Sequence, residues 1–311
     1  MKIIFMGTPD FAVGTLEALV QAGHEVVLAV TQPDKPQGRK QVLVAPPVKE
    51  KALELGIPVF QPKRVREPES LRVIRDYEPE LIVVAAFGQI LPKELLDMPP
   101  YGCINVHASL LPKYRGAAPI QWSILNGDEV TGVTIMRMDV GLDTGDMIAK
   151  TEVKIAPEDT GGTLFDRLAE AGAKLCVETI PSIVDGTAVY TPQDESAATK
   201  VGMIKKQDGL IDFTRSAKAI ECQVRGLNPW PSAYTFLAGK TLKIWSADLC
   251  EGGDPSDAGK VAFIKKDCFG VQTGDGILVC KEVQLEGKKR MPAGDFLRGI
   301  SIEAGTVLGD M

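Results

Sequence analysis

Two hydrophobic patterns alternate along the first two thirds of the chain. Short continuous apolar runs, typical of buried strands, are separated by segments with an apolar residue every three or four positions, typical of helices. We expect strands at "KIIFM", "EVVLAVT", "PVF", "LIVVAAF", "GCINVH" and "GVTIMRM", and helices at residues 10–22, 48–55, 68–77, 117–126 and 161–184. Continuous apolar strands between helices indicate a sheet that is covered on both faces. The pattern therefore predicts a doubly wound, mostly parallel α/β domain of Rossmann-like type over residues 1–186.

A different pattern follows. Residues 187–206 are polar and lack sustained periodicity, so we expect a linker there. A short helical stretch, "TRSAKAIECQVRG", comes next. Short β-type runs then recur between Gly-rich turns, at "YTFLA", "TLKIW", "KVAFI", "GVQTG", "GILVC" and "KEVQL". This spacing predicts a small β-barrel of OB-like type over residues 207–311.

Composition and charge narrow the classes of function. The 311 residues are 44% hydrophobic and 24% charged, enough for two domains with cores. No apolar run reaches about eighteen residues and no signal peptide is evident, so we expect a cytoplasmic protein without membrane contact. The net charge is −6, with 20 basic and 27 acidic residues in 1–200 (−7) and 15 and 14 in 201–311 (+1). Any contact with a polyanion is therefore expected to be local.

The six cysteines are scattered, and none has the C-x-x-C spacing of a metal or redox site. We interpret them as reduced thiols, mostly buried, and expect chemistry that needs no metal. The stretch "FMGTPDFAVGTLEAL" has the strand, glycine turn and helix of a dinucleotide site. It lacks the G-x-G-x-x-G spacing, however, so we interpret Gly7 as part of a tight turn.

The strongest candidate chemistry lies at the end of the run "GCINVH". Asn105 and His107 are two residues apart in a strand, so their side chains face the same side. Both side chains donate hydrogen bonds, and two converging donors are typical of an oxyanion hole for acyl transfer. A histidine at a strand end is more often a packing residue. His24, the other histidine, follows a helix-ending glycine and fits that simpler interpretation.

A catalytic histidine usually has a carboxylate partner. The segment "DVGLDTGD" offers Asp139, Asp143 and Asp146, and spacing alone does not choose among them. No Ser or Cys lies in a nucleophile pattern such as G-x-S-x-G, so direct transfer to an incoming amine is favoured over an acyl-enzyme.

At this point the residues resemble a known family. "NVHASLLPKYRGAAPIQWSILNGD", followed by "TGVTIMRMDVGLDTGDMI", is similar to the signature of the folate-dependent formyltransferases. "GTPDFA", "VVAAFGQILP" and "NPWPSAY" extend the resemblance over nearly the whole chain. The resemblance implies formyl transfer from 10-formyltetrahydrofolate to an amine, with catalytic residues at Asn105, His107 and Asp143. It also implies a folate pocket formed by Phe87, Gly88, Ile90, Leu91, Ser109, Leu110, Leu111 and Pro112, where apolar groups pack the pterin and backbone groups bond its edge.

The acceptor is a separate question, because one catalytic core serves several amines. Lys35, Arg39 and Lys40 lie in the Pro/Gly-punctuated stretch "TQPDKPQGRKQVLVAPP", where the resemblance implies a loop that contacts a tRNA acceptor stem. After Arg39 the segment reads Lys40-Gln41-Val42, which departs from the Gly-Lys-Lys run that is usual in the family. Lys205 and Lys206 are further candidate phosphate contacts in the second domain. The resemblance thus implies initiator methionyl-tRNA as acceptor and a role in translation initiation, and we expect the protein to be a monomer.

Three other functions remain open at this stage. An amino-sugar formyltransferase, acting on a UDP-4-amino sugar, carries a comparable second domain and is the stronger rival. A glycinamide-ribonucleotide formyltransferase normally consists of the catalytic domain alone, which residues 205–311 argue against. A non-catalytic protein that binds nucleic acid or a dinucleotide would not need Asn105, His107 and Asp143 together.

Overall fold

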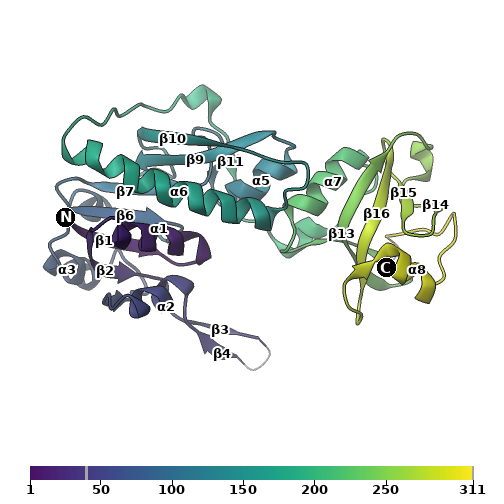
Figure 1. The fold of residues 1–311 in the computed structure, drawn as a ribbon, viewed down its shortest axis with the longest axis horizontal. Helices are drawn as coiled ribbons and strands as arrows, with labels where there is room; N and C mark the ends of the chain where they lie inside the picture. Colours follow the sequence, from purple (N-terminus) through teal and green to yellow (C-terminus); the bar gives the residue numbers. More distant parts are fainter. Residues whose placement is uncertain (39–40, 310–311) are drawn as a thin grey trace. The chain divides into compact units, whose positions relative to one another are not determined.

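A seven-stranded sheet forms the centre of the first unit in the computed structural model, which describes residues 1–38 and 41–309 (Figure 1). Unit 1 comprises Met1–Pro119, Val130–Lys154 and Phe165–Val201. The strand order is β10-β9-β7-β6-β1-β2-β5, and the pairs among β7, β6, β1, β2 and β5 are parallel. β9 and β10 add to the edge in antiparallel fashion. The strands are β1 (Lys2–Gly7), β2 (Glu25–Val30), β5 (Val59–Phe60), β6 (Leu81–Ala85), β7 (Cys103–His107), β9 (Val130–Arg137) and β10 (Met147–Lys154).

Helices cover both faces of this sheet, as the continuous apolar strands predict. Ile4 and Met6 of β1 belong to a buried cluster that includes Leu71 and Ile74 of α3, while the alternate residues Ile3 and Phe5, also fully buried, face the other side. On that side α1 and α6 pack together, with the rings of Phe11 and Phe165 5.6 Å apart. The helices of unit 1 are α1 (Asp10–Gln21), α2 (Pro47–Glu54), α3 (Pro68–Asp76), α4 (Lys93–Leu96) and α6 (Gly161–Val184), whose first residues up to Leu164 are assigned to unit 2. Helix α5 (Pro119–Leu125) lies in unit 2 from Ile120 onward.

The turn after β1 is tight because Gly7 leaves no room for a side chain. A Cβ at this position would lie 2.7 Å from that of Ala12 and 2.9 Å from the carbonyl oxygen of Ala85. The structure thus agrees with the interpretation of Gly7 as a close-packed turn.

Besides the short helix α4 and the turn at Glu195–Ala197, three features of unit 1 were not predicted. β10 is one, and the second is the hairpin of β3 (Lys35–Gln37) and β4 (Val42–Val44), which lies where we expected an irregular loop. The third is the short parallel pair of β8 (Arg115–Gly116) and β11 (Lys200–Val201). Because β11 and the turn η1 (Glu195–Ala197) lie in the segment expected to be a linker, that segment has ordered contacts with unit 1.

Unit 2 comprises Ile120–Glu129, Ile155–Leu164 and Gly202–Met311. Its antiparallel sheet has the order β12-β13-β16-β15-β14, with β17 paired to β16. The runs "GILVC" and "KEVQL", expected as two strands, form one continuous strand, β16. The elements are η2 (Lys206–Gly209), α7 (Ala217–Gly226), β12 (Ala233–Leu237), β13 (Lys240–Cys250), η3 (Pro255–Asp257), β14 (Val261–Ile264), β15 (Phe269–Gln272), β16 (Ile277–Leu285), β17 (Met291–Pro292) and α8 (Ala293–Gly299).

Helix α7 begins where Ser216 accepts a hydrogen bond from the Ala219 N–H at 3.2 Å. Its buried face, with Ile220 and Val224, joins a core formed by the strands and by Phe296 of α8. The C-terminal segment connects the two edge strands: Leu308 N–H donates to Gly259 before β14, and Gly309 N–H donates to Phe236 of β12. This segment closes the sheet in the manner expected of a small barrel.

Candidate active site

His107 and Asn105 project from β7 on the same face, as their spacing predicts. His107 is 6% exposed and Asn105 is half-buried. Among the described residues, none hydrogen-bonds the side-chain amide of Asn105. That amide is therefore free to donate to a ligand.

Of the three candidate carboxylates, Asp143 is the one beside His107. Its Oδ2 lies 3.8 Å from His107 Nδ1 and accepts a hydrogen bond from the Gly116 N–H at 2.8 Å. Asp139 instead accepts bonds from the Gly141 N–H and the Thr144 hydroxyl. The residue that the resemblance selected is thus the one that the structure brings to the histidine.

The tautomer of His107 follows from its second contact. Nε2 lies 3.0 Å from the carbonyl oxygen of Tyr114, and a carbonyl only accepts, so Nε2 carries a proton. Nδ1, the other ring nitrogen, faces Asp143. At 3.8 Å the pair is an ion pair when the ring is protonated, rather than a hydrogen bond. The arrangement provides a donor and an adjacent carboxylate for a developing oxyanion and a departing proton.

The loop 109–112 is fixed to the neighbouring strand β9. Thr134 of β9, which pairs with His107, donates its hydroxyl to the Ser109 carbonyl and accepts from the Leu111 N–H. The Ser109 hydroxyl donates to the Lys113 carbonyl at 2.6 Å, and Leu111 is 1% exposed. Leu110 and Pro112 are half-buried. The loop therefore presents mainly backbone groups and the side chains of Leu110 and Pro112.

The second loop expected in the folate pocket follows β6. Phe87 and Leu91 are 2% and 3% exposed and belong to the core, whereas Ile90 is 79% exposed. Gly88 adopts φ 79°, a region that favours glycine. The Phe87 carbonyl accepts bonds from Thr8 and from Gln32. Of the three apolar side chains of this loop that were expected in the folate pocket, Ile90 alone is open to solvent.

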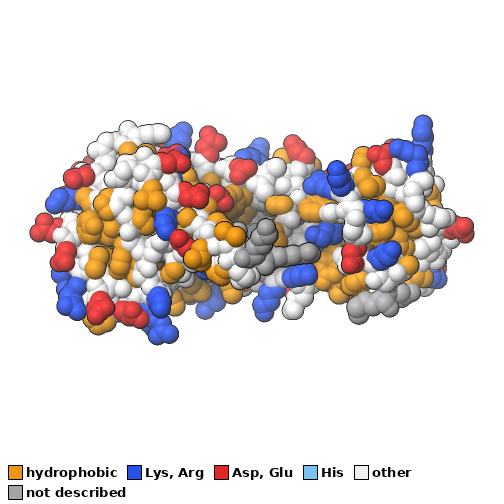
Figure 2. All heavy atoms as spheres, turned by 90° about the horizontal axis from the view of Figure 1, so that it is seen from below, with side chains coloured by type: hydrophobic (Ala, Val, Ile, Leu, Met, Phe, Trp, Pro, Cys, Tyr) orange, Lys and Arg blue, Asp and Glu red, His pale blue; other side chains and the backbone are white. Residues whose placement is uncertain are grey.

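The basic candidates lie on exposed surface where the structure describes them. Lys35, in the β3–β4 hairpin, is exposed, and Arg39 and Lys40 lie outside the described residues. Lys205 and Lys206 are exposed at the start of η2. Figure 2 shows basic, acidic and apolar side chains interspersed over the face it presents. This mixture is consistent with polyanion contacts that are local.

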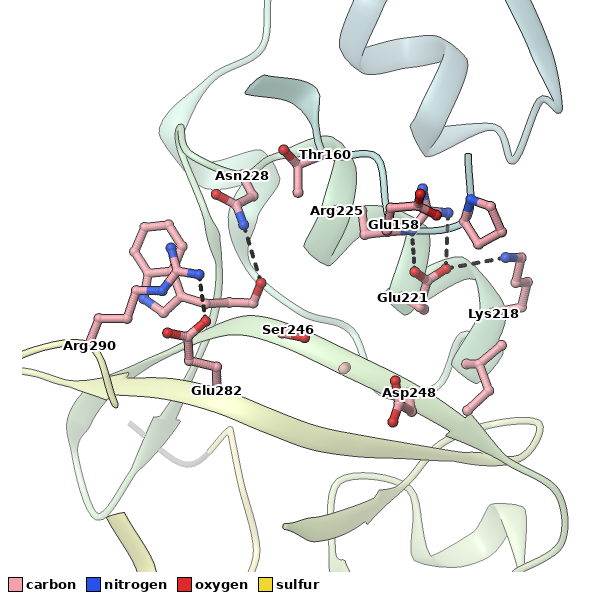
Figure 3. Close-up of a pocket in the computed structure, with 14 residues that line it drawn as sticks. Glu158, Thr160, Lys218, Glu221, Arg225, Asn228, Ser246, Asp248, Glu282 and Arg290 are labelled. Atoms are coloured by element: carbon pink, nitrogen blue, oxygen red, sulfur yellow. Dashed lines mark hydrogen bonds and ion pairs between the residues drawn. The ribbon is translucent and has the colours of Figure 1, made fainter. Parts of the chain in front are cut away.

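A cavity in unit 2 contains none of the expected site residues (Figure 3). Glu221 bonds both Arg225 and Lys218, and Arg290 lies against Glu282. The lining of this cavity includes three basic residues and four acidic ones: Lys218, Arg225, Arg290, Glu158, Glu221, Asp248 and Glu282. A lining without excess positive charge does not favour a phosphate site.

Sequence reasoning missed four residues that support the site. Thr134 fixes the loop 109–112, and Gln89 fixes its own loop by bonding the Val65 N–H and the Pro62 carbonyl. Arg115 and Gln193 bond each other, and Gln193 bonds the Asp143 loop. A buried position for Arg115 is not visible in sequence, and a lone Gln in a polar segment gives no signal before its partners are known.

The remaining expectations concern cysteines, metals and membranes. The six cysteines are free; Cys250 is exposed and the others are buried, which agrees with the sequence interpretation. In residues 1–38 and 41–309, no group of three or more His, Cys, Asp or Glu side chains is arranged to hold a metal ion. The helices of the same residues include none that is both long and apolar enough to cross a membrane.

Comparison with known proteins identifies the family. The family model for formyl transferase matches residues 1–180, and that for the formyl transferase C-terminal domain matches residues 203–301. The chain is 61% identical to a methionyl-tRNA formyltransferase of Agathobacter rectalis, over 98% of this chain and 99% of that one. It is 53% identical to a methionyl-tRNA formyltransferase of Bacillus subtilis, over 99% and 98%.

Solved structures support the fold. An N-formyltransferase from Helicobacter canadensis, in complex with folinic acid and dTDP-3-aminofucose, has a TM-score of 0.66 at 18% identity, covering 94% of this chain and 100% of that one. HypX from Aquifex aeolicus, in complex with tetrahydrofolic acid, has a TM-score of 0.64 at 17% identity, covering 98% of this chain and half of that one. These likenesses show the fold alone. With both of its domains matched and full-length relatives at more than half identity, the chain belongs to the formyl transferase family, within the group of the methionyl-tRNA formyltransferases.

Proposed function

We propose that the protein transfers the formyl group of 10-formyltetrahydrofolate to the free amino group of methionine on initiator methionyl-tRNA. The observation that carries this function is full-length identity to methionyl-tRNA formyltransferases, extending through the second domain. The convergence of Asn105, His107 and Asp143 supports the same reaction, because formyl transfer passes through a tetrahedral oxyanion.

In the proposed mechanism, the neutral methionine amine attacks the formyl carbon and the carbonyl electron pair moves to oxygen. The Asn105 amide and the Nδ1–H of protonated His107 donate hydrogen bonds to this oxyanion, and the adjacent Asp143 carboxylate supports the charge on the ring. Asp143 accepts the proton that the attacking nitrogen loses. The bond between the formyl carbon and N10 then breaks, and N10 of tetrahydrofolate takes up that proton. The sum is one formyl group transferred and one proton moved from the amine to N10.

The donor site is proposed at the two loops beside β6 and β7. Residues Phe87, Gly88, Ile90 and Leu91 form one side and residues 109–112 the other. The buried side chains of Phe87, Leu91 and Leu111 leave backbone groups and the side chains of Ile90, Leu110 and Pro112 as the contacting surface, so hydrogen bonds to the pterin edge would come from the main chain.

For the acceptor, we propose that tRNA phosphates are contacted by Lys35 of the β3–β4 hairpin, by Arg39 and Lys40, and by Lys205 and Lys206. Their exposure in the described part of the chain supports this assignment. We further propose that the protein acts as a monomer in the cytoplasm, where aminoacyl-tRNA is used. Light scattering of the purified protein at micromolar concentration tests the first point.

The experiment offers three acceptors separately with 10-formyltetrahydrofolate: methionine-charged initiator tRNA, glycinamide ribonucleotide and a UDP-4-amino sugar. We expect fast formylation of the charged tRNA, strong loss in His107→Ala, and unchanged rates in His24→Ala, a matched control at a half-exposed position after α1. Reaction of the amino sugar alone would overturn the proposed acceptor but not the proposed catalytic residues. Activity of His107→Ala equal to the parent would overturn the site.

A further inference from the structure

The loop that carries Asp143 is held by the segment between the two family domains. Gln193 Nε2 donates to the carbonyl of Asp143 and to that of Gly145, each at 2.8 Å. One amide group thus uses both of its protons on two carbonyls of the same loop. Residue 193 lies between the two ranges that the family models match, 1–180 and 203–301.

Asp143 needs such support because its backbone is in the left-handed region, with φ 54°. An Asp tolerates this region better than most residues, but it persists only where the surroundings impose it. Gln193 holds the carbonyl of Asp143, and the Gly116 N–H holds its Oδ2. The two contacts fix the main-chain carbonyl and the side chain of Asp143, and they leave its carboxylate beside His107.

The orientation of Gln193 is itself determined by a buried charge. Arg115 Nε donates to Gln193 Oε1 at 2.9 Å, so the amide oxygen faces the guanidinium and the NH₂ faces the loop. Arg115 is 1% exposed, and its other nitrogens bond Glu195 at 3.0 and 2.6 Å. These bonds raise the pKa of Arg115 and lower that of Glu195. Because Glu195 is mostly exposed, we place the main constraint in the Arg115–Gln193 contact.

The strand β8 supports Asp143 in two ways: the Gly116 N–H bonds its carboxylate directly, and Arg115 bonds Gln193, which holds its carbonyl. Arg115 and Gly116 form β8, which pairs with Lys200 and Val201 of β11. The Thr199 hydroxyl accepts the Tyr114 N–H, next to the carbonyl that holds His107 Nε2. The segment 193–201 therefore contacts the supports of both catalytic side chains.

We propose that Gln193 is a positioning residue that sets the Asp143 carboxylate beside His107, with Arg115 fixing its amide. The proposal rests on the role proposed for Asp143 in catalysis. It also assigns a function to the segment 193–201: the catalytic aspartate is held from outside the range matched by the family's catalytic-domain model.

The test is a double-mutant cycle in the full chain, measured with charged initiator tRNA and 10-formyltetrahydrofolate. We expect Gln193→Ala to lower kcat about 10- to 100-fold, since small displacements of a catalytic group have effects of this size. KM for both substrates should stay within about 2-fold. In the Asp143→Asn background, the same Gln193→Ala change should have almost no further effect on kcat, because Gln193 acts through Asp143.

Two further variants separate positioning from folding. Gln193→Glu keeps the oxygen that faces Arg115 and removes the two donated bonds, so we expect a loss of kcat close to that of Gln193→Ala at an unchanged Tm. Gln21→Ala, an exposed glutamine at the end of α1, is the matched control and should leave kcat unchanged.

The outcomes are distinct. An equal loss of kcat from Gln193→Ala in both backgrounds, a change in KM alone, or full activity of Gln193→Glu would overturn the positioning role. Full activity of Asp143→Asn by itself would instead overturn the role of Asp143 in the proposed function.

Discussion

The His107 region and the β3–β4 hairpin differ in how the chain holds them. Around His107, the side chains proposed to react are buried or half-buried, and hydrogen bonds from β9, β8 and the segment 193–201 hold Asp143 and the loop 109–112 beside them. The hairpin carries exposed apolar side chains, Val42 at 59% and Leu43 at 68%, on a two-stranded sheet of its own. A two-stranded hairpin is marginal alone. In the proposed function, the chemistry is thus placed on preorganised geometry, whereas acceptor recognition is assigned to a surface that a partner can complete.

The hairpin is nevertheless held at one point, at Asp34, the residue before its first strand. Lys49 of α2 donates to both oxygens of Asp34, at 2.9 and 2.8 Å, and to Gln61 Oε1 at 2.8 Å. Hydrogen bonds from Lys49 and Gln61 lower the pKa of Asp34, so its carboxylate is ionised at neutral pH. The anchor precedes Lys35 directly. The hairpin is therefore fixed at one end and exposed beyond it.

The largest expected effect is at the preorganised site. Asn105→Ala should lower kcat about 10²- to 10³-fold, because it removes one donor to the oxyanion. KM for 10-formyltetrahydrofolate should change little, since the donor acts mainly in the transition state. Steady-state kinetics with charged tRNA measures both constants. Equal losses in kcat and in donor affinity would contradict an oxyanion role for the amide.

A smaller effect is expected at the hairpin. Replacing Lys35, Arg39 and Lys40 together by Ala should raise KM for charged tRNA about 10-fold or more and leave kcat close to the parent value. The salt dependence of kcat/KM should also weaken, by about one in log-log slope for each phosphate that the hairpin no longer neutralises. The matched control replaces Lys63, Arg64 and Arg66, an exposed basic group in the same unit. Equal effects from the two triple variants would show that the hairpin contributes only general charge.

The smallest effect is expected at Lys49, which holds Asp34 at the start of the hairpin. Lys49→Met removes the bonds to Asp34 and Gln61, so the hairpin should become more mobile while the catalytic residues stay in place. We expect KM for charged tRNA to rise about 3-fold at constant kcat, and amide exchange to quicken in the described hairpin residues. Lys51→Met, in the same helix and paired with Glu17 and Glu54, is the control. A fall in kcat without a change in KM would place Lys49 in the catalytic region instead.

The sequence predicted the parts that depend on local pattern. The buried strands of unit 1 are continuous apolar runs, so the strands and the helices between them were recognisable. The shared face of Asn105 and His107 was predictable because side chains two residues apart in a strand point to the same side. β10 was missed because "MIAKTEVK" alternates buried and exposed positions only weakly at the edge of the sheet. The hairpin was missed because Val42, Leu43 and Val44 bury no face. Contacts such as that of Gln193 with Asp143 join residues fifty positions apart, and no local pattern encodes them.

The C-terminal closure of unit 2 has a practical consequence for handling the protein. Leu308 is 4% exposed, and the segment around it covers the open edges of β12 and β14. Deleting the chain from Thr306 onward would leave those edges unpaired, and unpaired strand edges recruit other chains. Affinity tags and fluorescent fusions are thus better placed at the N-terminus, and nonsense mutations that remove only the last six residues should yield insoluble protein.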